Sequence, residues 1–138
     1  MGHVDLVRQG SCGGALGDLT KMVVRDTVNK VFANGATIVA IEAHMTHTRT
    51  ALGYAETSAL ERLLIDNILL CWLRLHDAEL SFNQAGRDAP SFSQRVFFER
   101  WLTLTQRRYL RAVETLARVR KLGVNVQINV ARQQIVNG

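Results

Sequence analysis

The end of this 138-residue chain constrains its fold most, because apolar and polar side chains alternate without interruption over residues 124–130. This period of two is typical of a half-buried β-strand. No earlier segment has the pattern of a partner strand, and a lone strand leaves its backbone N–H and C=O groups unpaired. The sequence therefore predicts that residues 123–138 form a β-strand tail that pairs between copies of the chain in a homo-oligomer. The residues expected at contacts between copies are Val124, Val126, Ile128, Val130, Trp72 and Tyr109.

The remainder of the chain has the spacing of helices, so we predict a mainly α fold. Residues 1–16 are rich in glycine and indicate a flexible arm, and residues 17–122 indicate one helical domain. Apolar stripes predict two shorter helices that meet near Asn34 and Gly35, a usual signal for a helix end. One helix with a kink at Gly35 is the alternative.

Two longer helices are expected to form an antiparallel hairpin. Ser58 and Glu61 have the spacing of a capping box ahead of an apolar run, which predicts a helix over 58–85. Pro90 separates it from a second helix over 91–122, whose apolar residues follow a 4-3 repeat suited to helix pairing. The expected core or interface residues are Leu64, Ile68, Trp72, Leu75, Leu102, Tyr109, Val113 and Leu116.

Composition limits the class of protein. The hydrophobic content of 47% is ordinary for a globular chain, and two cysteines are too few for a disulfide framework. No run of residues resembles a signal peptide, and the longest apolar run, 63–75, is too short to span a bilayer. We therefore expect a cytoplasmic protein without a membrane partner.

Three polar positions in the sequence are candidates for a metal site or for chemistry. His44 and His47 share a helical face but have no clear third ligand, so a polar helix face and a partial metal site both remain open. Asp66 lies in an apolar run, and its partner is either Arg62 one turn earlier or an arginine from a neighbouring helix. The chain has no nucleotide motif or catalytic triad. The sequence predicts that it is not an enzyme and holds no metal or cofactor; a metal-dependent enzyme using the two histidines is a further alternative.

The helix expected over 91–122 is strongly basic. It carries eight Lys or Arg residues against two Glu, while the helix over 58–85 carries two Arg against four acidic residues. This charge indicates either binding of nucleic-acid phosphates or pairing between the two helices. The candidate nucleic-acid-binding residues are Arg107, Arg108, Arg111, Arg118, Arg120 and Lys121.

Two blocks of sequence resemble a widespread family of uncharacterised bacterial proteins. The first runs from Leu60 through Trp72-Leu73 to Glu79, and the second covers 106–117, followed by 126–130 and Gln133-Gln134. The resemblance extends from about Gly17 to the C-terminus and implies no particular activity.

The order of a long helix and then a strand also resembles the C-terminal part of small terminase subunits of tailed phages. That resemblance covers only the last ~45 residues and implies a non-catalytic ring that binds double-stranded DNA and passes it to a separate ATPase. The helix-turn-helix expected at the front of such proteins is not evident over 19–52. The alternative function is a structural assembly or protein-interaction module that binds no nucleic acid.

Overall fold

The computed structural model describes residues 12–31 and 35–137, and it confirms the prediction of a mainly α chain. Four α-helices and one short 3-10 helix follow one another in the described part of the chain, which contains no strand. Their bounds are α1 Cys12–Val31, α2 Gly35–Ala51, η1 Tyr54–Glu56, α3 Ala59–Arg87 and α4 Phe92–Val136.

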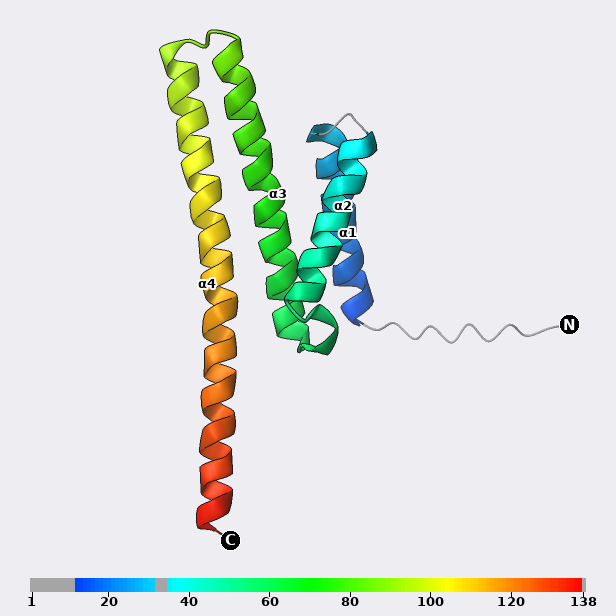
Figure 1. The fold of residues 1–138 in the computed structure, drawn as a ribbon, viewed down its shortest axis with the longest axis vertical. Coiled ribbons are helices and arrows are strands. Elements are labelled where there is room, and N and C mark those ends of the chain that lie inside the picture. Colours follow the sequence, from blue (N-terminus) through cyan, green and yellow to red (C-terminus); the bar gives the residue numbers. More distant parts are fainter. Residues whose placement is uncertain (1–11, 32–34, 138) are drawn as a thin grey trace, which may run out of the picture.

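Helices α3 and α4 run antiparallel and lie side by side, with α1 and α2 on the other side of α3 (Figure 1). Each long helix is preceded by a capping serine whose hydroxyl oxygen accepts a hydrogen bond from the backbone N–H three residues on. Ser58 accepts from Glu61 N at 3.3 Å, and Ser91 accepts from Gln94 N at 3.3 Å. Gln94 also completes a capping box, because the Ser91 backbone N–H donates to its side-chain oxygen at 2.9 Å.

The core follows one side of α3 and then continues between α3 and α4. Ile65, Leu69 and Leu73 recur every four residues on α3 and are completely or almost completely buried. Helices α1 and α2 contact this stripe through Val28, Ile41 and Met45, whereas α4 contributes Ala112 and Leu116. Because α3 packs against α1 and α2 on one side and against α4 on the other, its apolar stripe holds the described helices together.

The expected core residues divide into three groups in the structure. Ile68, Leu75 and Leu116 are buried, while Val113 is exposed. The other four expected residues are half-buried: Leu64, Trp72, Leu102 and Tyr109.

The predicted C-terminal strand is wrong for this structure, because α4 continues without a break to Val136. Gly123, the first residue of the predicted tail, lies within α4, where a glycine is tolerated at a cost of up to about 1 kcal/mol. Alternating apolar residues also fit a helix, since positions four apart such as Val124 and Ile128 return to one face. The tail is therefore a helical extension and cannot pair through strand hydrogen bonds in this conformation.

Other boundaries also differ from expectation. Helix α1 begins at Cys12, inside the segment predicted as a flexible arm, and residues 1–11 lie outside the described part. Helices α1 and α2 are two elements that lie side by side and share a surface pocket, which excludes one helix kinked at Gly35. Residues 32–34, which include the expected end signal at Asn34, lie outside the described part.

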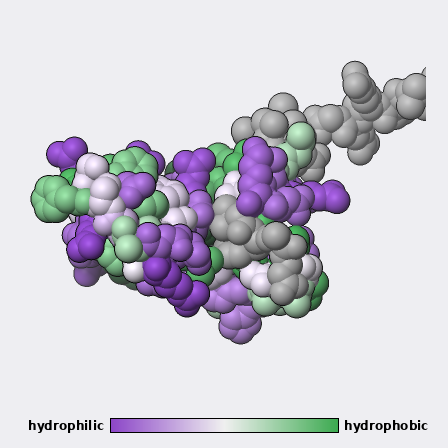
Figure 2. All heavy atoms as spheres, turned by 90° about the horizontal axis from the view of Figure 1, so that it is seen from above, coloured by the Kyte–Doolittle hydropathy of each residue, from purple (hydrophilic) through white to green (hydrophobic). Residues whose placement is uncertain are grey.

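Hydrophobic side chains are spread over the surface as well as the core. Phe92 is 84% exposed and Phe97 is 62% exposed near the turn between α3 and α4. The view from above shows green hydrophobic and purple hydrophilic residues intermixed (Figure 2). None of the helices within residues 12–31 and 35–137 is long and apolar enough to cross a membrane.

Candidate nucleic-acid interface

Four arginines of α4 share the face opposite the residues that pack on α3. Arg100, Arg107, Arg111 and Arg118 are seven, four and seven residues apart, a spacing that places them on one side of a helix. The buried residues Thr105, Ala112 and Leu116 occupy the other side. We call these four residues the arginine stripe; it is about 27 Å long at 1.5 Å per residue.

The stripe has few intramolecular partners. Arg118 is 3.9 Å from Glu114, but both side chains are largely exposed, so this pair contributes little to stability. Among the described residues, the guanidinium groups of Arg100, Arg107 and Arg111 have no hydrogen-bond or ion-pair partner. Three guanidinium groups on one helix face are thus available to an anionic partner.

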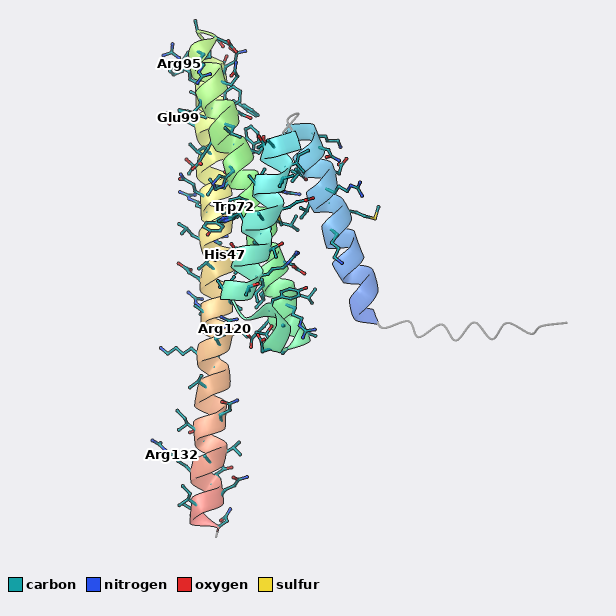
Figure 3. The ribbon with its side chains drawn as sticks, turned by 45° about the vertical axis from the view of Figure 1, so that its right-hand side comes forward. His47, Trp72, Arg95, Glu99, Arg120 and Arg132 are labelled. Carbon is teal, nitrogen blue, oxygen red and sulfur yellow. The ribbon has the colours of Figure 1, made fainter. Side chains whose placement is uncertain are left out.

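Two other predicted phosphate ligands lie elsewhere. Arg120 donates from Nε to Glu61 Oε2 at 3.1 Å and from Nη2 to the Leu52 carbonyl, which ties α4 to the start of α3 and the end of α2 (Figure 3). Arg108 lies on the side of α4 that borders α3, near Arg74. Lys121 is exposed beside the stripe, one turn after Arg118.

Asp66 is held by an arginine from a neighbouring helix, one of the two alternatives expected from the sequence. Its Oδ1 accepts hydrogen bonds from Arg49 Nε at 3.2 Å and Arg49 Nη2 at 2.9 Å, while Oδ2 accepts from the Tyr54 hydroxyl at 3.0 Å. Arg62 instead donates to the carbonyls of Tyr54 and Ala55 at 3.0 and 2.8 Å. Both carboxylate oxygens of Asp66 are thus used in joining α2, η1 and α3.

Tyr54 completes this junction. Burial raises the pKa of its hydroxyl above the usual value, and the hydrogen bond to the Asp66 carboxylate raises it further. The guanidinium groups of Arg49 and Arg62 lie 5.4 and 5.8 Å from the centre of its ring, within cation–π range. Tyr54 therefore stays protonated as a hydrogen-bond donor, and the geometry gives it a structural role.

The two candidate metal ligands do not meet a third one. His44 stacks on Trp72 with ring centres 4.3 Å apart, and His76 lies on the same indole at 4.2 Å. His47 is exposed on α2 (Figure 3). Within the described ranges, no three His, Cys, Asp or Glu side chains are grouped so that they could hold a metal ion.

The candidate oligomerisation residues fall into two groups. Trp72 and Tyr109 pack against the core of their own chain, so they are used inside the subunit. Val124, Ile128 and Val130 are exposed at 54%, 46% and 47%, on the part of α4 that extends beyond the start of α3. The side chain of Val126 lies outside the described part.

The predictions from the sequence do not include Arg100 as a member of the stripe or Arg74 as a neighbour of Arg108. Arg100 could have been found from its heptad spacing to Arg107, which keeps two residues on nearly the same side of a helix. Arg74 could not have been assigned this way, because its proximity to Arg108 depends on how α3 and α4 pack.

Comparison with known proteins identifies no relative: no family model, curated protein or solved structure matches this chain.

Proposed function

We propose that this protein is a non-catalytic DNA-binding protein that contacts phosphates through the arginine stripe of α4. The observation that supports this most is the alignment of Arg100, Arg107, Arg111 and Arg118 opposite the buried side of that helix. Over its whole length α4 carries nine Lys or Arg residues and two Glu. A positive face of this length attracts a polyanion and releases the counterions condensed on it.

The stripe is suited to the DNA backbone. Duplex DNA carries about one charge per 1.7 Å of its axis, so a 27 Å face passes many phosphates. Arginine binds phosphate oxygens through its planar fork of N–H donors. Contacts of this kind position a protein on the duplex without selecting a sequence.

The DNA proposal predicts a steep dependence of affinity on salt. If the four stripe arginines each neutralise one phosphate, the slope of log K against log [salt] is about −3.6. The double variant R107Q/R111Q should shift this slope to about −1.8 and bind more weakly at low salt. Fluorescence anisotropy with a labelled duplex, measured between about 50 and 200 mM salt, checks both values.

The matched control is R25Q/R87Q, which removes two exposed arginines outside α4. It changes the net charge equally and should retain the slope of the unmodified protein. Equal losses in both double variants would indicate a general charge effect and contradict the stripe. If R107Q/R111Q changes the native mass instead of the DNA affinity, the stripe is an assembly surface.

A second candidate function, a homo-oligomeric assembly module, is favoured by the extension of α4. The Arg120–Glu61 hydrogen bond lies close to the start of α3, and residues 121–136 continue for about 24 Å beyond it. In Figure 1 this extension has no neighbouring helix. Its exposed apolar side chains include Leu122, Val124, Ile128, Val130, Ile135 and Val136.

Such an extension gains from a partner helix. β-branched residues lower helix propensity, and short isolated helices are marginal in water. Burying this apolar surface against a second copy would stabilise both helices through helix packing, in place of the strand pairing expected from the sequence. Ring closure and transfer of DNA to an ATPase stay predictions that rest on the resemblance to small terminase subunits.

The assembly proposal predicts that I128N/I135N lowers the native mass. Two asparagines on the extension remove apolar area needed between copies, so the variant should dissociate at concentrations where the unmodified protein is associated. Sedimentation velocity over a dilution series measures this change. Control variant M22N/V23N replaces two exposed apolar residues on α1 and should keep the native mass. An unmodified protein that is monomeric throughout the series would contradict the proposal.

A further inference from the structure

A small pocket lies between the two long helices, apart from the arginine stripe. It has a volume of about 160 Å³ and is lined by Asn67, Leu70, Cys71 and Arg74 from α3 and by Thr105 and Arg108 from α4. Arg108 follows Arg107 directly, so the two side chains lie about 100° apart around the helix. The pocket therefore faces a different direction from the stripe.

The pocket has an excess of positive charge. Arg74 and Arg108 come from different helices, and neither guanidinium group forms a hydrogen bond or ion pair with any described residue. The lining contains no Asp or Glu. Two like charges that line one pocket repel each other, and an anion between them would offset this repulsion.

The pKa of the Cys71 thiol depends on the charges that line the pocket. Burial raises the pKa of its thiol, while the positive charges of Arg74 and Arg108 oppose that rise. Both guanidinium groups are thus close enough to act on a group in the lining. An anion bound there would interact with both.

The polar groups also favour an anion. Asn67 Oδ1 is 3.9 Å from Cys71 Sγ, which donates to it, so the two N–H donors of the amide remain for a ligand. The Thr105 hydroxyl lies 3.1 and 2.9 Å from the carbonyls of Trp101 and Leu102, and its hydrogen is used there. The donors that remain in the lining are two guanidinium groups and one amide, which suit an oxyanion.

We propose that Arg74, Arg108 and Asn67 form a binding site for a phosphate-sized oxyanion between α3 and α4. A water molecule occupies ~30 Å³ in the liquid, so a pocket of about 160 Å³ has room for a tetrahedral anion and some water. The anion is either a free phosphate or a phosphodiester of nucleic acid. Binding of free phosphate does not depend on the stripe, so this site and the proposed DNA contact can fail separately.

Alkylation of Cys71 provides the test. In a C12S background, Cys71 is the remaining cysteine of the chain, and neutral iodoacetamide avoids competition between the reagent and the anion. Inorganic phosphate should slow alkylation at least 3-fold relative to chloride at equal ionic strength, because the bound anion covers the thiol and neutralises the arginines that favour the thiolate. R74Q and R108Q should each abolish the difference, whereas R107Q, on the stripe, should keep it.

A short DNA duplex distinguishes the two sources of phosphate. Protection by inorganic phosphate alone identifies a free anion as the ligand, and protection by both identifies the nucleic-acid backbone as a second source. Protection by DNA alone overturns the proposal, since it indicates shielding by DNA bound elsewhere. Equal rates in phosphate and chloride also overturn it. If the thiol reacts too slowly, phosphate-dependent NMR shifts of the Asn67 side-chain amide decide instead, and unchanged shifts overturn the site.

Discussion

Replacing Leu73 with alanine should lower the free energy of unfolding by about 3 kcal/mol. Leu73 has no exposed surface and lies on the α3 stripe that contacts both sides of the fold. Its truncation removes apolar contacts and leaves a cavity that helices held on two sides can fill only in part. Urea denaturation followed by far-UV circular dichroism measures the loss at a fixed protein concentration.

Leu80 provides a matched control on the same helix. Leu80 is 49% exposed, so L80A should cost at most about 0.5 kcal/mol. The two variants remove the same atoms from the same type of helix, and helix propensity therefore cancels between them. Equal losses would contradict the position of Leu73 in the centre of the core.

The helical class and the central role of α3 could be predicted because both depend on local patterns. The apolar run around Leu69 is too wide for a surface helix, and Ser58 marks the start of this helix in the sequence as in the structure. Ser91 and Gln94 have the equivalent spacing in the sequence, and in the structure they form a capping box at the start of α4. Boundaries set by such short-range hydrogen bonds can be predicted without tertiary information.

The C-terminal segment shows where local patterns fail. Alternation over 124–130 favours a strand, yet the same residues continue a helix whose preceding turns are already packed on α3. Adding a residue to an existing helix avoids the cost of a new nucleus. A period of two over seven residues therefore could not decide between the two structures.

The polar contacts depend on tertiary packing to an even greater degree. The sequence indicates that Asp66, in an apolar run, needs a partner, and it leaves Arg62 and an arginine from a neighbouring helix as alternatives. The partner, Arg49, comes from another helix seventeen residues earlier. Arg120 likewise is a candidate phosphate ligand in the sequence, whereas in the structure it donates a hydrogen bond to Glu61, fifty-nine residues earlier. Charge in a sequence shows which residues need partners and does not show where the partners are.

Replacing Arg49 with methionine should lower the free energy of unfolding at neutral pH by about 3 kcal/mol. The Asp66 side chain is 8% exposed, and Arg49 supplies both hydrogen bonds to its Oδ1. Methionine fills much of the same volume and leaves the carboxylate with the Tyr54 hydroxyl as its remaining partner. The Arg49 side chain is 26% exposed, so water reaches part of the vacated site and places the expected loss at the lower end of the range for broken buried pairs.

A double variant separates the effect of the buried charge on stability from the effect of the lost packing. In R49M/D66N the amide oxygen can still accept from Tyr54, and no charge is left without a partner. This double variant should be more stable than R49M by about 1.5 kcal/mol, measured by urea denaturation. A double variant no more stable than R49M would show that Arg49 acts through packing alone. Because the junction of Arg49, Tyr54 and Asp66 joins α2 to α3 and leaves α4 untouched, the folded fraction of each variant should retain the DNA affinity proposed for the arginine stripe.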